Sequence, residues 1–478
     1  MSAGDAVSLR EAEPKKEKQL QRNLSPLNVW ALAFGCTIGW AAFVMPGTAF
    51  LKRAGPLGSM IAIEVGMVVM LILSYSYHYM LQRFPVSGGE YVYASRAFGR
   101  ELGFVCAWYL SLCYLCVVPL NATALGLAGR VLLGKYLQFG FHYAVAGYDV
   151  YMGELLLAVT PMLLFAFIGD LKVHVMANIQ TVLAILLLGG VLVLILAVTF
   201  HPGEVVSGLS PLFQPGENLF VQTIAVAVTA PQLFVGFDTT PQFAEESKFS
   251  LDRSKVIMDT CIFCGAFVYI ALLLLAAIAP QEYPNWHGYI EDLPNKQGIE
   301  SIPTLYTAYR LLGNAGTWVW TIAAVSAMLT GIIGFYVATS RLLYSLARDR
   351  MLPNWFAQLN RNSAPFHASL FCMALSVAAP FFGRTLLNWA FDMASFGGTL
   401  SFACTCLAAR KYALQDGRKD IAVFGTLGFF FSAALAFFLL VPLPALGCSI
   451  SAESSICLIL WSALGAAFFF RNRRRIRS

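Results

Sequence analysis

The 478-residue chain is 58% hydrophobic and 12% charged, and it carries a formal net charge of +6. Soluble domains contain about 25% charged residues, so this composition excludes an ordinary soluble protein. A mean hydropathy of +0.67 indicates instead an all-α polytopic membrane protein.

About twelve apolar stretches are long enough to be helices that cross a hydrocarbon core of roughly 30 Å. We predict transmembrane helices at residues 28–50, 57–82, 101–134, 150–169, 175–199, 219–245, 256–279, 315–343, 366–383, 387–409, 421–443 and 453–470.

The N-terminal tail, residues 1–27, is polar and has no apolar core of a signal peptide, so we expect it to stay uncleaved. With this tail inside and twelve spans, most of the 32 Lys and Arg residues fall in inside segments. The positive-inside rule then predicts that both termini are cytosolic, in a protein of the cell membrane. The basic end, residues 471–478, adjoins a span and is interpreted as a topology anchor in contact with membrane lipid, not as a nucleic-acid arm.

Two apolar stretches, far apart in the chain, are interrupted near their middle. The first interruption runs from Gly35 to Gly47, and the second from Phe234 to Pro241. An unwound backbone at membrane depth survives only where it is buried in protein or lines a cavity. A matched pair of broken helices, one in each half, is the best sequence indication of a secondary transporter's binding site.

The chemistry of such breaks suits a zwitterion. Small residues let a ligand approach the backbone, free N–H groups suit a carboxylate, and free carbonyls accept from an ammonium group. We therefore predict an amino acid or a close analogue as the substrate. The alternative is that these glycines only kink tightly packed helices. The predicted substrate-binding residues are Thr37, Ile38, Gly39, Trp40 and Ala41 in the first break, Phe234, Val235, Gly236 and Asp238 in the second, and Tyr114 on the third helix.

Several motifs resemble one family. They are Ile38-Gly39-Trp40-Ala41-Ala42-Phe43-Val44-Met45-Pro46-Gly47, Gly55-Pro56-Leu57-Gly58, the run from Arg83 through Ser87-Gly88-Gly89-Glu90-Tyr91 to Phe98-Gly99, Gly236-Phe237-Asp238, and the run from Ser340 to Pro353. In these the chain resembles the amino acid–polyamine–organocation (APC) superfamily of permeases.

The resemblance implies a LeuT-like fold of two inverted five-helix repeats with discontinuous helices 1 and 6. The repeats would be residues 28–199 and 219–409, with two peripheral helices in 421–470, so that 28–470 forms one transporter domain of twelve helices.

The chain departs from the family pattern at several positions, and one of them is Ala41, where the family usually has Gly. Trp40 stands where the family usually has Ser, and we hypothesise that it narrows the site or stacks on a cationic amine; equally, its ring could pack between helices. Leu187 stands where proton-coupled members carry a Lys on helix 5, so coupling through that Lys is not carried over.

Acidic residues within the membrane are costly and are therefore functional candidates. Asp238 is interpreted as a proton-titrated gate or a partner of a substrate amine, with helix capping as the structural alternative. Asp238 and Glu64 are the two candidates for proton coupling, although Glu64 could equally pair with a polar group near the interface. Asp392 is expected to be structural, and Glu245 and Glu246 to pair with Lys or Arg at an inner gate.

Other polar residues in apolar helices are weaker pocket candidates, because most such groups only hydrogen-bond between helices. They are Asn121, Ser326, Thr330, Ser395 and Thr399, and Tyr114 is preferred over all of them as an occluding lid.

The sequence thus predicts a secondary active transporter that moves an amino acid, a neutral one being favoured, by proton symport or exchange. Transport of a cationic amino acid, polyamine or amine is the alternative, and a non-transporting sensor is a further one. Enzyme motifs such as H-E-x-x-H and G-x-S-x-G do not occur, and the six His are dispersed. We predict no enzyme activity, cofactor or metal site. Cys448 and Cys457 are candidates for a disulfide if their side of the membrane is oxidising.

Overall fold

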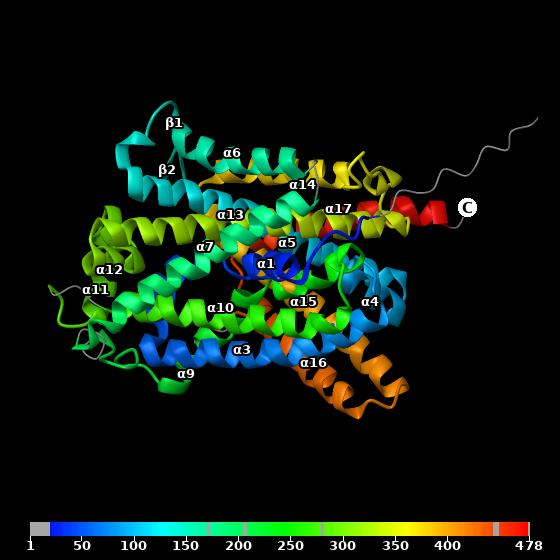
Figure 1. Ribbon diagram of the computed structural model, residues 1–478, viewed down its shortest axis with the longest axis horizontal. Coiled ribbons are helices and arrows are strands. Elements are labelled where there is room, and N and C mark those ends of the chain that lie inside the picture. The colour runs from blue at the N-terminus through cyan, green and yellow to red at the C-terminus, as the bar shows by residue number, and fades with distance from the viewer. Residues whose placement is uncertain (1–19, 170–172, 204–207, 279–281, 443–448, 477–478) are drawn as a thin grey trace, which may run out of the picture.

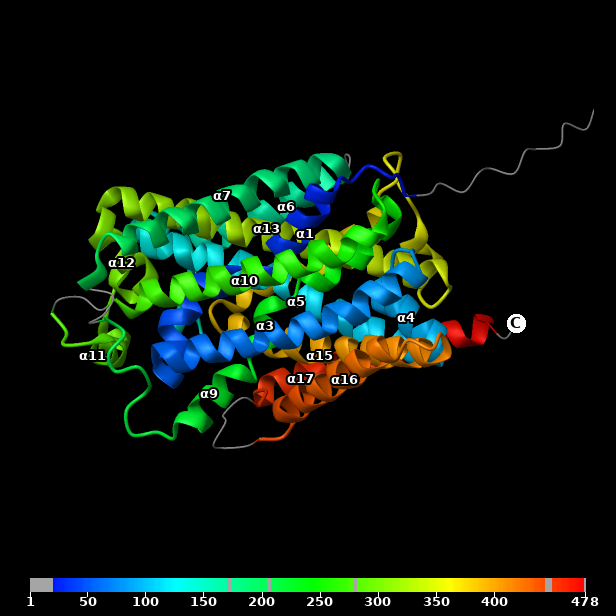
Figure 2. The ribbon, with the colours of Figure 1, turned by 60° about the horizontal axis from the view of Figure 1, so that its bottom comes forward.

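The computed structural model of the protein describes residues 20–169, 173–203, 208–278, 282–442 and 449–476. The long helices lie side by side in a bundle along the longest dimension (Figures 1 and 2). One end of this bundle carries α4 and the C-terminal end of the chain, and the opposite end carries α11 and α12. We call them the α4 end and the α12 end.

The helices are given by type, and each type is in chain order. The α-helices are α1 (Pro26–Thr37), α2 (Trp40–Met45), α3 (Leu51–Arg83), α4 (Gly89–Phe98), α5 (Arg100–Leu133), α6 (Met152–Gly169), α7 (Val173–Thr199), α9 (Leu219–Ala227), α10 (Ser254–Ala277), α11 (Trp286–Asp292), α12 (Pro303–Leu312), α13 (Asn314–Arg348), α14 (Phe366–Ala378), α15 (Thr385–Gln415), α16 (Lys419–Leu440) and α17 (Ala452–Ile476). A π-helical turn, η1 (Pro46–Phe50), links α2 to α3. The 3-10 helices are η2 (Gly134–Tyr136), η3 (Ala230–Phe234), η4 (Phe237–Glu246), η5 (Leu251–Arg253), η6 (Leu293–Asn295), η7 (Gly298–Ser301), η8 (Asn354–Ala357) and η9 (Ala379–Phe382).

Every predicted stretch contains helix, which confirms the helical, polytopic class. Within the described residues, eight helical segments are long and apolar enough to cross a membrane. They are Trp40–Arg83, Arg100–Tyr136, His174–Thr199, Leu219–Glu246, Leu251–Ala277, Asn314–Arg348, Lys419–Leu440 and Ala452–Arg471, and two shorter apolar segments are Met152–Phe167 and Phe366–Phe382.

Both predicted breaks are confirmed. The first lies between α1 and α2, where Ile38 and Gly39 adopt extended backbone angles. The second lies between η3 and η4, where Val235 leaves the helical region and Gly236 has a φ of +141°. The chain resumes as a helix after each break, so each interruption is short.

The start of α1 is fixed by local chemistry. Ser25 caps the helix through the backbone N–H of Asn28, and Pro26 occupies the first turn, where its missing N–H costs nothing. The Asn28 side chain also donates to Asn178 and Thr181 of α7, at 3.2 Å each. The helix therefore begins two residues before the predicted position and is anchored to α7 from its first turn.

The last residues of the predicted N-terminal tail belong to the fold. Leu24 is fully buried, and the backbone N–H groups of Asn23 and Leu24 both donate to the carbonyl of Glu246 at 2.9 Å. The carbonyl of Leu24 accepts from Lys248 N, also at 2.9 Å. This pairing ties the segment before α1 to the end of η4.

Two ion pairs join the end of η4 to α13 at the same end of the bundle. Arg341 binds both carboxylate oxygens of Glu246 at 3.1 Å, with both side chains buried. Arg348 binds both oxygens of Glu245 at 2.9 and 3.2 Å in a more exposed position. The predicted pairing of Glu245 and Glu246 with basic residues is thus confirmed, and we call these four residues the gate cluster.

Connections between the spans hold structure that the sequence analysis did not predict. The β-hairpin of β1 (His142–Val145) and β2 (Tyr148–Tyr151) lies between α5 and α6, with His142 opposite Tyr151. Helix α3 begins before the predicted span and kinks at Gly55, whose φ is +65°. Cys448, the partner proposed for Cys457, lies outside the described residues.

The gate cluster offers a matched test of stability. Glu246→Gln leaves the Arg341 charge buried without its counter-ion, which should cost about 3–5 kcal/mol of unfolding free energy. Glu245→Gln breaks the more exposed pair and should cost about 0.2–1 kcal/mol. Thermal unfolding of the two purified variants in detergent measures the difference. Equal unfolding temperatures would show that burial does not distinguish the pairs.

Candidate functional site

The two breaks lie directly against each other. A Cβ atom placed on Gly236 would lie 2.4 Å from the backbone nitrogen of Thr37 and 2.6 Å from the carbonyl carbon of Cys36. With its φ of +141°, this position requires glycine on two independent grounds. The predicted site residues Thr37 and Gly236, almost 200 positions apart in the sequence, are therefore in backbone contact.

Asp238 and Tyr114 meet beside this contact. The Tyr114 hydroxyl of α5 donates to Asp238 Oδ2 at 2.7 Å, and Gly236 N donates to Oδ1 at 2.6 Å. Both side chains are fully buried. Within the described residues, no Lys, Arg or His forms an ion pair with Asp238. Tyr114, predicted as an occluding lid, thus binds Asp238, the predicted acidic residue of the second break. The Asp238 carboxylate has no cationic partner among the described residues.

The first break is capped by a side chain from α5. Asn121 Oδ1 accepts from the backbone N–H of Trp40 at 3.0 Å, while Asn121 Nδ2 donates to the carbonyl of Val117 at 3.0 Å. A Cβ on Gly39 would lie 2.6 Å from the same Oδ1. The N–H of Trp40 is therefore satisfied within the protein by Asn121. The expectation that N–H groups of this half-helix bind a ligand stays a prediction.

The remaining residues of the predicted set differ in burial. Thr37, Ile38, Phe234 and Val235 are buried, whereas Gly39, Trp40 and Ala41 are only half-buried. The Trp40 indole packs against the apolar core, and its Nε1 is buried without a hydrogen-bond partner among the described residues. This placement agrees with the packing alternative for Trp40 and leaves its effect on substrate size a prediction.

Gln180 of α7 is a positioning residue whose role the sequence analysis missed. Its Nε2 donates to the carbonyls of Thr330 at 3.0 Å and Ala31 at 3.3 Å, which joins α7, α13 and α1. A Cβ on Gly35 would lie 2.3 Å from that nitrogen, so the small residue makes the approach possible. The signal available in the sequence was a polar Gln within an apolar stretch.

Leu187, which stands on the same helix in place of the family's Lys, is fully buried.

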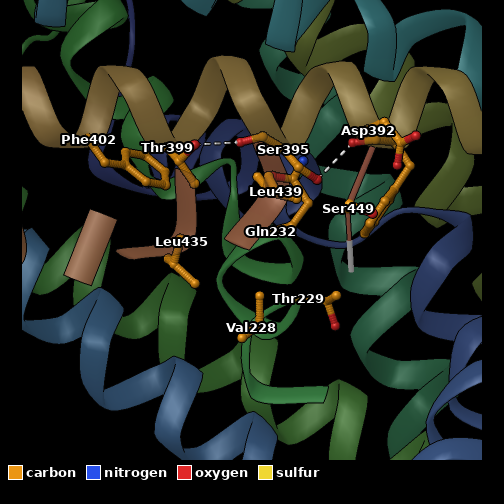
Figure 3. Close-up of a pocket in the computed structure, with 11 residues that line it drawn as sticks. Val228, Thr229, Gln232, Asp392, Ser395, Thr399, Phe402, Leu435, Leu439 and Ser449 are labelled. Carbon is orange, nitrogen blue, oxygen red and sulfur yellow. Dashed lines mark hydrogen bonds between the residues drawn. The ribbon is translucent and has the colours of Figure 1, made fainter. Parts of the chain in front are cut away.

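A pocket of about 180 Å³ lies next to the second break (Figure 3). Asp392, Ser395 and Thr399 of α15 line one wall, and Thr229 and Gln232 line the facing wall. Ser395 and Thr399 were weaker pocket candidates from sequence, and both line this pocket. Its lining stops two residues before Phe234, so the pocket adjoins the break without including it.

The other acidic candidates have separate places. Glu64 is an exposed residue of α3, and the described part of the protein gives it no hydrogen bond or ion pair, so the structure does not bring it to the breaks. Asp392 accepts from Ser451 N at 3.0 Å and Ser454 Oγ at 2.8 Å, which fixes the start of α17. This contact is the structural role expected for Asp392.

These features define a class: a multi-pass helical membrane protein in which two broken helices meet around a buried carboxylate. A family model described as "Amino acid permease" matches residues 24–464, and the chain belongs to this family. This match confirms the resemblance that the motifs gave. The members of the family are transporters and not enzymes.

Relatives of several kinds are similar to the chain. A vacuolar cationic amino acid transporter 4 of Arabidopsis thaliana is 23% identical over 84% of this chain and 65% of its own length, so the chain spans less than two thirds of that protein. A methylthioribose transporter of Bacillus subtilis is 22% identical over 96% of this chain and 95% of its own. A histidine permease of Lactococcus lactis is 23% identical over 85% and 83%, respectively.

The contact between the breaks can be tested with one methyl group. Gly236→Ala places a Cβ against the backbone of Thr37 in a left-handed conformation, and should lower the unfolding free energy by at least about 1–3 kcal/mol. Gly99→Ala is the control, because Gly99 also has a positive φ of +96° but no atom within 4 Å of its Cβ position. Thermal unfolding of both variants should show the larger loss at Gly236. An equal loss would mean that backbone strain alone matters.

Proposed function

We propose that the protein is a secondary active transporter that moves an amino acid, a neutral one being favoured, across the cell membrane by proton symport or exchange. The observation that carries the proposal is the contact of Gly236 with Cys36 and Thr37. Two broken helices in contact leave unwound backbone within the bundle, and such backbone is the usual ligand-binding element of secondary transporters.

In this proposal the chain has twelve spans arranged as two inverted five-helix repeats with two peripheral helices. The moving bundle consists of α1 with α2, α3, the α9 to η4 segment and α10. It rocks or gates against a scaffold of α5, α6, α13 and α14. The α4 end faces the cytosol, with both termini inside, and the gate cluster closes that end when the substrate is exposed to the other.

A cationic amino acid or amine is the second candidate substrate. Asp238 supports it, since a buried carboxylate without an ion-pair partner among the described residues suits an ammonium group. The plant relative is named as a transporter of cationic amino acids. A sensor that binds without transport is the third candidate.

Uptake into proteoliposomes tests the function. The panel is radiolabelled L-leucine, L-serine, L-arginine and L-histidine, offered with and without an inward proton gradient and with or without internal unlabelled amino acid. Accumulation in empty vesicles under the gradient is expected for a symporter, and uptake only into preloaded vesicles for an exchanger. Binding of a panel member without flux would favour the sensor, and neither binding nor flux would reject the proposal.

Asp238→Asn tests the acidic residue within the same assay. Loss of the charge should weaken interaction with a cationic substrate by about 1.5–3 kcal/mol, so uptake of L-arginine should fall more than that of L-leucine. Tyr114→Phe is the matched control, because it removes one hydrogen bond to Asp238 and keeps the charge. Equal losses for both amino acids would assign Asp238 to capping. An unchanged pH profile of Asp238→Asn would exclude a proton-titrated gate there.

A further inference from the structure

A second buried carboxyl lies close to the site, and neither the fold nor the breaks account for it. Glu90, in the first turn of α4, has no exposed surface. Its Oε2 accepts from Gln242 Nε2 at 3.0 Å, and its Oε1 is buried without a hydrogen-bond partner among the described residues. A carboxylate left in this state would carry a large desolvation cost.

The charges around Glu90 do not offset its own. No Lys, Arg or His in the described part of the chain forms an ion pair with it. The titratable groups that interact with it from the elements packed around α4 are Asp238 of η4, Tyr77 of α3, Tyr93 of α4, and Cys106, Cys113 and Tyr114 of α5. Two charged residues bond to α4 from the elements packed against it: Asp349, which follows α13, accepts from the Tyr91 hydroxyl, and Lys411 of α15 donates to the carbonyl of Ala97.

Glu90 and Asp238 differ in their hydrogen bonds. Both oxygens of Asp238 accept hydrogen bonds, from Tyr114 and Gly236, and this stabilises a carboxylate. Glu90 accepts a hydrogen bond of normal length from Gln242 alone. Burial raises the pKa of the Glu90 carboxyl well above its usual range, and the nearby Asp238 charge acts in the same direction, whereas Gln242, the more distant Tyr77 hydroxyl and the Glu90 backbone N–H oppose this rise. Neighbouring carboxyls whose environments favour different protonation states take different roles.

Acceptors for a carboxylic O–H are present in the same cluster. Gln242 Oε1 is buried and has no hydrogen-bond partner among the described residues. The Tyr77 hydroxyl is also buried in this cluster and can either accept from a neutral Glu90 or donate to an ionised one. A neutral Glu90 carries one O–H donor, which an ionised Glu90 lacks. Protonation therefore removes a buried charge and supplies a donor to a cluster that contains an unpartnered acceptor.

The position of Gln242 connects Glu90 to both the site and the gate cluster. Gln242 follows Asp238 by four residues on η4 and precedes Glu246 by four. At Gly89, where φ is +41°, a Cβ would lie only 2.8 Å from Gln242 Nε2, so α4 and η4 pack closely here. An ionised Glu90 would favour separation of these two elements, because separation admits water to the charge.

We propose that Glu90 binds the transported proton while the α4 end is closed and releases it to water when that end opens. The proposal rests on the transporter function proposed above and assigns its coupling proton to a residue outside both breaks. The proton arrives with the substrate from the opposite side, neutralises Glu90, and permits α4 to close on η4. Its release on the α4 side completes the symport of one proton with one substrate molecule.

Glu90→Gln mimics the protonated state and tests this proposal in the proteoliposome assay with the same four labelled amino acids. We expect proton-driven accumulation to be lost while exchange with internal unlabelled amino acid remains and no longer depends on pH. Asp420→Asn is the matched control, because that carboxylate is exposed and pairs with Arg418 at the start of α16. It should retain both activities.

The outcomes distinguish failure of the proposed transporter function from failure of the proposed proton site at Glu90. Wild-type protein that moves no amino acid in either mode rejects the transporter function. Wild-type exchange without proton-driven accumulation, or accumulation that persists in Glu90→Gln, rejects the proton site alone. If Glu90→Gln does not fold, infrared spectroscopy of wild-type protein with isotope-labelled glutamate decides the matter. A buried glutamic acid band at neutral pH that disappears on alkaline titration supports the proposal, and its absence overturns it.

Discussion

The structure depends on one constraint: backbone N–H and C=O groups in an apolar surrounding must find partners. Two helices of this protein give up part of their internal hydrogen bonds, one at Ile38 and Gly39 and the other at Val235 and Gly236. Neighbouring elements supply replacements through side chains, with Asn121 accepting from Trp40 N and Asp238 from Gly236 N. The breaks therefore persist because a side chain of the neighbouring helix α5 and one of η4 itself satisfy their backbone N–H groups.

A single short helix connects the proposed events of transport. Helix η4 begins at the second break with Asp238, contacts Glu90 through Gln242 in its middle, and ends in the carboxylates of the gate cluster. A shift of η4 would alter all three contacts together. The acidic groups on η4 or in contact with it have different partners: Asp238 binds a hydroxyl, Glu90 of α4 binds the amide of Gln242, and Glu245 and Glu246 bind guanidinium groups. They therefore respond differently to a proton or an ammonium ion. In the proposed mechanism, η4 would therefore link the substrate site to the α4 end of the bundle.

Much of the fold was predictable because the membrane imposes a length and an apolarity on every span. Helical segments occupy all twelve predicted stretches, and both breaks occur at the small residues that indicated them. Structure in the connections was not predictable in this way. The helices α11 and α12 and most of the hairpin at residues 142–151 lie between the predicted spans and were treated as loops. Residues 150 and 151 were predicted as the start of a span, but they belong to β2, and the helix begins at Met152. The residues just before α1 were predicted as part of the N-terminal tail, residues 1–27, but Leu24 is buried and its backbone is bonded to the end of η4.

The sequence by itself determined the class of protein, the positions of the two breaks and the presence of Asp238 and Tyr114 as polar groups at membrane depth. These depend on local composition, which a single chain segment expresses. Only the tertiary structure decided that Tyr114 binds Asp238, that Asn121 occupies the Trp40 N–H, and that Glu64 lies on the exposed side of its helix. It also decided that Glu90, named from sequence only within a motif, is buried and forms no ion pair with a described Lys, Arg or His. Which face of an apolar helix meets which neighbour is set by long-range packing, and an apolar sequence with little amphipathic pattern does not encode that choice locally.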